Sequence, residues 1–422
     1  MAAPCANALA SPVRECFIAR QPIFDSGRHV IGYELLFRSS ARDHFNHHDG
    51  DAASSQLVSD ALSVFGIRLL TAGCKAFINF TRQGLLQGHA YLLPAAQVVV
   101  ELLEGIEPDR EVLQACRQLK RDGYTLALDD FQYNPKLEPL VELADIIKID
   151  FRLATPEQGR RLGQQAASSQ RILLAEKVET WQEYQEALAW GYQYFQGFFF
   201  CRPELLASKE LLPSRLAVLR LLAELNRADV DLESVERIIK QDPPLSLKVI
   251  AYLNSALFGW QYHVTSIWRA VVLLGLNNLR RWISLFAMAS LATDRPQELF
   301  RTCLVRARFC ELLGRQAGLE TQELDLFLIG LLSSIDAILG QPLEELLERL
   351  AVADDVHQAL MSGRGPLGRI YALVQAYEQG DWDNVLATAS ALELADGGLV
   401  EAYLEALQWA ADTSLQVHQA CL

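Results

Sequence analysis

Acidic and amide side chains stand at the ends of short apolar runs throughout the first half of this chain. Glu34 lies in VIGYELLFR, Asn79 in KAFINF, and Glu101 in QVVVELLE. Other polar residues are placed in the same way in YTLALDDF, DIIKID, ILLAEKVET and YFQGFFF. Carboxylate and amide oxygens gathered at one place are hard donors that hold divalent cations, which can activate water. The pattern therefore predicts a divalent-metal site.

The elements that must position these residues alternate along the chain. From Cys16 to about Pro203, runs typical of strands are followed by amphipathic helical patterns, which favours parallel pairing in an α/β fold. The carboxyl ends of such strands form the active-site mouth of a (β/α) barrel. The opening runs CFIARQPIFD and HVIGYELLFR are separated only by SGRH, which allows an antiparallel pair.

Helix ends in this half carry local signals. Asp109 is a candidate N-cap for REVLQACRQLKRD, and Thr180 is one for TWQEYQEALAW. Gly123 and Gly191 follow these two helices, where a left-handed residue commonly ends a helix.

The aromatic run FFF at 198–200 is interpreted as buried strand instead of a base-stacking platform.

The second half has a different pattern. After Pro203 the apolar residues recur at spacings of three and four, which predicts an all-helical domain. We expect a tail at 1–15, a barrel at 16–205, a linker at 206–215 and a helical domain at 216–422.

Composition excludes several classes of protein. A net charge of -14 argues against binding to nucleic acid or to an anionic membrane, since both require a basic surface. The eight cysteines form no C-x-x-C pair, so we expect reduced thiols. The most apolar late stretch, LFLIGLLSSIDAILG, is too short for a membrane span and contains Asp336. We expect a cytoplasmic protein.

The strand-end motifs resemble the EAL family of cyclic di-GMP phosphodiesterases over residues 17–205. The signature tripeptide is Glu34-Leu35-Leu36, in which Leu35 replaces the usual alanine. The resemblance implies an EAL-type, TIM-like barrel that binds cyclic di-GMP. It also implies that Gln21, in the opening QPI strand, lies near the ligand and that Arg38 contacts a phosphate.

The same resemblance implies roles for the other strand-end residues. Mg²⁺ or Mn²⁺, as two ions, would be held by Glu34, Asn79, Glu101, Asp129, Asp130 and Glu176. Lys148 would orient or deprotonate the attacking water, with Glu176 and Gln196 as the other catalytic residues. Glu104 and Glu179 would support the active-site loop. The expected product is linear pGpG.

One loop departs from the family pattern. After DDF the family has a glycine-rich loop, whereas this chain has QYNPK at 132–136. The loss of glycine and the gain of proline should stiffen this loop. Because the loop supports metal binding and dimer contacts in the family, both catalysis and a homodimer stay open. Lys177 also replaces a family glycine beside Glu176.

The helical half resembles an HDOD domain, in QDPPLSLKVIAYLNSALFG and SIWRAVVLLGLNNLR. Metal-dependent relatives place a His-Asp pair where this chain has Ser333-Ser334. Two hydroxyls do not replace that pair as metal ligands, so we expect this half to be catalytically silent and to bind a protein partner.

These inferences predict a tandem EAL–HDOD signalling protein of the bacterial type. The barrel would bind and hydrolyse cyclic di-GMP, and the helical half would transmit the output. The alternative is a non-catalytic cyclic di-GMP sensor or interaction scaffold. The intact carboxylate set favours the enzyme, whereas the altered loop favours the alternative. The sequence does not identify the partner, the pathway, or which domain controls the other.

Overall fold

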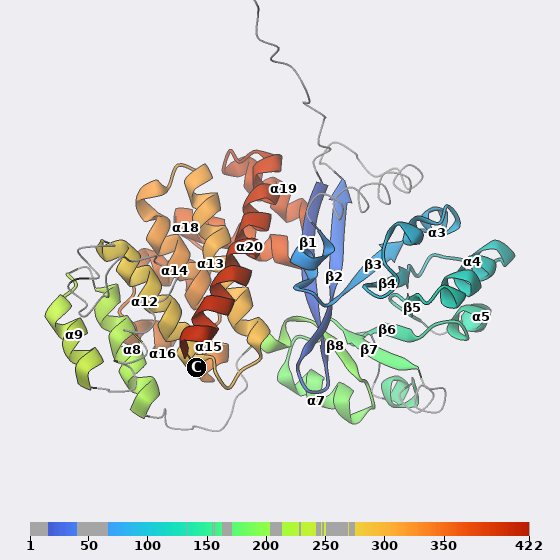
Figure 1. Cartoon of the computed structure of the whole chain (residues 1–422), viewed down its shortest axis with the longest axis horizontal. Helices are drawn as coiled ribbons and strands as arrows, with labels where there is room; N and C mark the ends of the chain where they lie inside the picture. Colours follow the sequence, from blue (N-terminus) through green and yellow to red (C-terminus); the bar gives the residue numbers. More distant parts are fainter. Residues whose placement is uncertain are drawn as a thin grey trace, which may run out of the picture.

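The computed structural model describes most of the chain. The described residues are 16–39, 66–132, 134–153, 155, 157–162, 171–202, 213–227, 229–241, 246, 249, 269 and 275–421. The tail predicted at 1–15 lies outside them, and so do residues 206–212 of the predicted linker. The helical half packs against one side of a barrel, and the first two strands lie between the two (Figure 1).

Eight strands close the barrel in chain order. They are β1 (Cys16–Asp25), β2 (Val30–Ser39), β3 (Lys75–Phe80), β4 (Val98–Leu102), β5 (Thr125–Leu128), β6 (Ile146–Asp150), β7 (Ile172–Glu176) and β8 (Tyr194–Gln196). β1 is antiparallel to both β2 and β8, whereas β2 through β8 run parallel. The predicted fold class, with its antiparallel opening pair, is confirmed.

Short helices connect the strands on the outside of the barrel. They are α2 (Ile67–Thr71), α3 (Arg82–Leu86), α4 (Arg110–Arg121), α5 (Glu138–Val141) and α7 (Trp181–Ala189). The predicted caps are present: Asp109 Oδ1 accepts from Val112 N at 2.9 Å, and Thr180 forms a capping box with Glu183. These caps satisfy backbone N–H groups that have no partner within the helix.

The aromatic run after β8 was predicted wrongly as a strand. It forms a 3-10 turn, η3 (Phe198–Cys201), with Phe199 and Phe200 buried. Gly197 breaks the strand, since its φ of 141° disfavours other residues and a Cβ there would meet Val178 O at 2.0 Å.

The second half is helical throughout its described residues, as predicted. Its helices are α8 (Pro213–Asn226), α9 (Leu232–Gln241), α12 (Leu276–Leu291), α13 (Gln297–Gln316), α14 (Glu323–Leu332), α15 (Ile335–Leu339), α16 (Leu343–Arg349), α17 (Asp354–Ser362), α18 (Gly365–Gln379), α19 (Trp382–Ala391) and α20 (Asp396–Cys421). Within the described residues, no helix has the length and apolar character to span a membrane.

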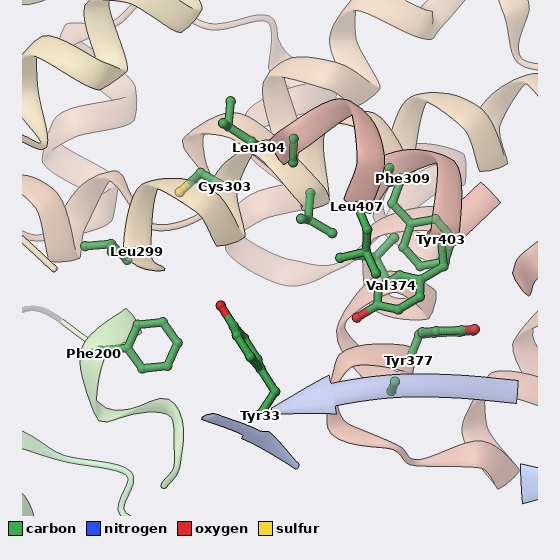
Figure 2. Close-up of a cluster of buried hydrophobic side chains, with 14 of the residues drawn as sticks. Tyr33, Phe200, Leu299, Cys303, Leu304, Phe309, Val374, Tyr377, Tyr403 and Leu407 are labelled. Carbon is green, nitrogen blue, oxygen red and sulfur yellow. The ribbon is translucent and has the colours of Figure 1, made fainter. Parts of the chain in front are cut away.

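The two halves share one apolar core. A single cluster of buried side chains runs from the outer face of the barrel into the helices. Figure 2 shows Tyr33 and Phe200 of the barrel half facing Leu299 and Cys303 of α13. The hydroxyl of Tyr33 donates to Glu298 Oε2 at 2.7 Å and accepts from Arg301 Nη1 at 3.1 Å. A smaller cluster fills the barrel interior: Ile23, Phe77, Val99, Ala127, Ile146 and Leu174.

The buried hydrogen bond between Tyr33 and Glu298 should stabilise the contact between the halves. We expect Tyr33→Phe to lower the stability by about 1–3 kcal/mol, because a buried carboxylate loses a donor. Thermal unfolding of the whole chain measures this loss. Tyr91→Phe is the control, since its hydroxyl bonds Asp122 at the surface and its loss should change stability by less than about 0.5 kcal/mol. Equal midpoints for the two variants would contradict the prediction.

Candidate active site at the carboxyl end of the barrel

The polar residues singled out in the sequence lie within their strands or directly after them. Asn79 is opposite Glu101 in the pairing of β3 with β4, and Gln21 is opposite Glu34 in that of β1 with β2. Because parallel strands in a barrel end at a common rim, the register brings these side chains to one mouth.

Lys148 lies at the centre of this mouth. Its ammonium is 2.6 Å from Asp129 Oδ1, 2.8 Å from oxygens of Glu101 and Glu176, and 3.3 Å from Glu34 Oε2. The Lys148 side chain has no exposed surface. One buried cation therefore faces four carboxylates, three on β2, β4 and β7 and one directly after β5.

Amide side chains complete the surroundings of Glu34. Gln196 Nε2 donates to Glu34 Oε2 at 2.6 Å and to Gln21 Oε1 at 3.1 Å, and Asn79 Nδ2 donates to Glu34 Oε1 at 3.0 Å. Both carboxylate oxygens of Glu34 are thus held in place. Residues from β1, β2, β3, β4, β6, β7 and β8, together with Asp129 after β5, form the cluster.

Burial and the neighbouring charges shift the pKa values of these groups. Burial raises the pKa of Glu101 well above its ordinary value and that of Glu176 to about 8, against the opposing effect of Lys148. Burial acts in the same direction on Glu34, but Lys148 and the amide donors outweigh it and lower its pKa. Burial opposes the charge of Lys148, but the surrounding carboxylates outweigh it and raise its pKa well above the ordinary value. Lys148 is therefore charged at neutral pH.

Several buried oxygens in this cluster accept no hydrogen bond. They are Asn79 Oδ1, Gln196 Oε1 and both carboxylate oxygens of Glu101. Glu101 is within ion-pair distance of Lys148, but this contact does not have hydrogen-bond geometry. Unsatisfied hard oxygens among several carboxyl groups fit the chemistry of a divalent cation. Within the described residues no three acidic, His or Cys side chains already form a metal shell, and Lys148 lies among the carboxylates.

Asp130 does not join the cluster around Lys148. Its backbone has a φ of 40°, and its Oδ1 accepts from Lys177 Nζ at 3.3 Å. Lys177, with a φ of 56°, also donates to Asp150 Oδ2 at 2.8 Å. Two non-glycine residues in the left-handed region thus face each other across the mouth, and backbone strain of this kind is common at functional sites.

The remaining predicted residues lie further out. Arg38 Nη1 bonds Asp383 of α19 at 2.9 Å, Glu179 pairs with Arg152 at 3.2 Å, and Glu104 is exposed after β4. In the altered loop, Asn134 Oδ1 accepts from Lys136 N at 3.0 Å and caps the turn η2 (Pro135–Leu137). Tyr133 lies outside the described residues.

In the helical half, a buried ion pair lies beside Ser333 and Ser334, the residues that stand in place of a metal-binding His-Asp pair. Arg306 Nη1 donates to Ser333 Oγ at 3.1 Å and to Ser334 Oγ at 3.0 Å, and Arg306 Nη2 is 2.8 Å from Glu378 Oε2. All four residues are buried or nearly so. A guanidinium matched to one carboxylate and two hydroxyls is a satisfied network, as buried ion pairs require.

Sequence reasoning missed two partners of the predicted residues. Lys177 was noted only as the replacement of a glycine. A lysine beside predicted metal ligands could have indicated that its ammonium pairs with one of those carboxylates. Asp383 lies 345 positions from Arg38, and no local pattern connects the two.

The fold and this rim of residues define an EAL-type barrel joined to a helical HDOD-type domain. The family model described as "EAL domain" matches residues 73–203, and the model described as "HDOD domain" matches residues 212–358. The "Cyclic di-GMP phosphodiesterase CdgJ" of Vibrio cholerae is 34% identical over 399 residues, covering 94% of this chain and 92% of that protein. The "Uncharacterized protein YuxH" of Bacillus subtilis is 35% identical over 401 residues, covering 93% and 97%. The chain belongs to the family of proteins in which an EAL domain is followed by an HDOD domain.

Solved structures resemble only part of the chain. The PaMucR phosphodiesterase in complex with c-di-GMP is 20% identical and has a TM-score of 0.39, covering 44% of this chain and 95% of that chain. Klebsiella pneumoniae BlrP1 in a manganese/cy-diGMP complex is 22% identical with a TM-score of 0.38, covering 46% and 57%. These likenesses are too distant to assign a role to any residue here.

Lys148 should hold the mouth together when no divalent cation is present. We expect Lys148→Met to lower stability by about 3–5 kcal/mol, because it leaves buried carboxylates without their counter-ion. Urea denaturation in EDTA, followed by circular dichroism, measures the loss. The control is Lys75→Met on β3, an exposed lysine whose loss should change stability by less than about 0.5 kcal/mol. Similar urea midpoints for Lys148→Met and Lys75→Met would mean that the charge of Lys148 does not stabilise the cluster.

Proposed function

We propose that the barrel binds cyclic di-GMP at its carboxyl mouth and hydrolyses it to linear pGpG with Mg²⁺ or Mn²⁺. The observation that carries this proposal is the convergence of the carboxylates of four residues on Lys148, with buried oxygens that accept no hydrogen bond. The name of the Vibrio cholerae relative, which matches nearly the whole chain, supports this choice of substrate.

The proposed metal ligands are the residues already named at the mouth: Glu34, Asn79, Glu101, Asp129, Asp130 and Glu176. When bound, divalent ions would acidify a water molecule and stabilise negative charge on the phosphate. Such a cation competes with Lys148 for the same carboxylates and with Lys177 for Asp130.

The structure bears on a choice that the sequence leaves open for Lys148. The surrounding carboxylates raise the pKa of Lys148, which favours a charged donor over a base. We assign it the role of holding the attacking water and neutralising charge. Gln196, fixed by Glu34 and Gln21, would hold the same water. Arg38 and Gln21 would contact the ligand, with the Arg38 guanidinium donating to a phosphate oxygen.

For the helical half we propose the role of binding a protein partner. The observation that supports a non-catalytic role is the network at Ser333 and Ser334. Both hydroxyls accept from Arg306, and Glu378 neutralises that guanidinium. The place where relatives hold metal is thus filled by a matched ion pair.

Turnover of cyclic di-GMP by the purified full-length chain tests the proposed enzyme. We expect linear pGpG to appear with Mg²⁺ or Mn²⁺ and the rate to fall at least about a hundred-fold in Glu34→Gln, since that change removes one charge from the mouth. Glu107→Gln, an exposed acid beyond β4, is the control and should retain the wild-type rate. Chromatography of the nucleotide products measures both.

Ligand binding measured in the same samples separates the alternatives. Binding without turnover would make the barrel a sensor, and the absence of both would make it an interaction scaffold. Either result contradicts the proposed hydrolysis.

Lys177 should weaken binding of a divalent cation because its ammonium already pairs with Asp130 and Asp150. We expect Lys177→Gly to bind Mn²⁺ about three- to ten-fold more tightly, given the strength of partly exposed ion pairs. Glycine also suits the φ of 56° at this position. Isothermal titration calorimetry measures the affinity, and Lys136→Gly is the control because Lys136 is exposed in the neighbouring loop. An unchanged affinity in Lys177→Gly would contradict competition between Lys177 and the metal ion.

A further inference from the structure

The turn between α18 and α19 lies against strand residues that we propose to hold the ligand. Gly380 approaches β2 so closely that a Cβ there would meet Leu36 Cδ1 at 2.8 Å. Gln21 Nε2 lies 3.5 Å from the carbonyl oxygen of Gln379. Because Gln21 pairs with Glu34, and Leu36 is two residues further along β2, both lie on the same face of the strand pair as Glu34.

Asp383, in the first turn of α19, makes the charged contact at this place. Its Oδ1 accepts from Arg38 Nη1 at 2.9 Å. The Asp383 side chain is 88% exposed, whereas that of Arg38 is 22% exposed. Solvent and solutes can therefore reach the carboxylate from outside, while the guanidinium is largely enclosed.

A ring contact holds the start of α19 beside this ion pair. Trp382 stacks on Phe17 with the ring centres 5.6 Å apart and an interplanar angle of 30°. Phe17 is directly opposite Arg38 in the pairing of β1 with β2. The start of α19 thus contacts both strands of the pair, one through a ring and the other through a charge.

The helix itself does not depend on Asp383 for its cap. Asp381 provides the cap, since its Oδ1 accepts from Asn384 N at 3.3 Å and its Oδ2 from Asn384 Nδ2 at 2.6 Å. α18 and α19 also lie beyond residues 212–358, which the HDOD model matches. Asp383 is therefore available for a role toward the barrel.

We propose that Asp383 occupies the phosphate-binding guanidinium of Arg38 until cyclic di-GMP displaces it, so that the ligand and the start of α19 exclude each other at Arg38. This inference rests on the proposed function. It makes Asp383 a residue of the helical half that sets the affinity of the barrel for its ligand. It also gives ligand binding a direct effect on the α18–α19 turn.

The strengths of the competing interactions fit such an exchange. An ion pair with one well-exposed partner is weak and is screened by salt. A phosphodiester offers the guanidinium two acceptor oxygens in place of one carboxylate contact, so it can replace Asp383. The coupling is reciprocal: a partner that draws the turn away from the barrel tightens ligand binding, and the ligand loosens the turn.

Steady-state kinetics of Asp383→Asn in the full-length chain test the proposal. We expect KM for cyclic di-GMP to fall about two- to five-fold with kcat unchanged, the range that an exposed ion pair contributes. The difference from wild type should shrink at high salt. Asp354→Asn is the matched control, because Asp354 is also an exposed aspartate in the first turn of a helix and its loss changes the net charge equally.

Hydrogen exchange gives a readout that does not depend on turnover rates. Saturating cyclic di-GMP should speed amide exchange at residues 380–386 of the wild type within the first seconds. In Asp383→Asn these amides should exchange faster before ligand is added, with a smaller further change. A structural role alone would leave exchange in the wild type insensitive to the ligand.

The outcomes are distinguishable. If Asp383→Asn and wild type share one KM and ligand leaves exchange unchanged, this inference is wrong and the proposed function stands. If Asp354→Asn lowers KM equally, the change in KM comes from the net charge of the protein and not from the contact with Arg38. The inference is then overturned. If wild type neither binds nor hydrolyses cyclic di-GMP, the proposed function fails, and the inference fails with it.

Discussion

The antiparallel pairing of β1 with β2 is the interaction on which both halves of the molecule depend. Its register runs without a break from Cys16 opposite Ser39 to Ile23 opposite Gly32. Because side chains alternate along a strand, neighbouring residues of β2 serve different halves. Tyr33 reaches the helical half, and Glu34 reaches the mouth of the barrel. A shift of one residue in this pairing would exchange these roles and disrupt both the site and the contact between the halves.

The buried clusters around Arg306 and Lys148 differ in how well their charged groups are matched by partners. This difference is why we assign a structural role to the first and a ligand-binding role to the second. Arg306 faces one carboxylate and two hydroxyls, which is a satisfied arrangement. Lys148 faces carboxylates of four residues, and both oxygens of Glu101 accept no hydrogen bond. Buried polar groups normally have hydrogen-bond partners. The cluster around Lys148 is therefore the one in which we expect a further ligand to bind.

The contact between the halves links the helices to the same strands that carry the site. Tyr33, Leu36 and Arg38 are within six positions of one strand, and α13, the α18–α19 turn and α19 contact it. The helical half therefore contacts the same strand that carries Glu34, with no intervening element. In a two-domain signalling protein, such a shared element is a physical route for coupling.

Much of the molecule followed from the sequence alone. The alternation of apolar runs and helical patterns predicted the barrel, and the spacings of three and four predicted the helical half. The apolar runs that carry Glu34, Asn79, Glu101 and Lys148 indicated that these residues meet at one mouth, because the strands of such a barrel share a rim. Local rules also predicted the caps at Asp109 and Thr180.

Other features were decided only by tertiary structure. Lys148 at the centre of the carboxylates, Lys177 on Asp130, and Asp383 on Arg38 join residues from separate elements. Periodicity and capping act over a few residues, whereas these ion pairs depend on how complete elements pack.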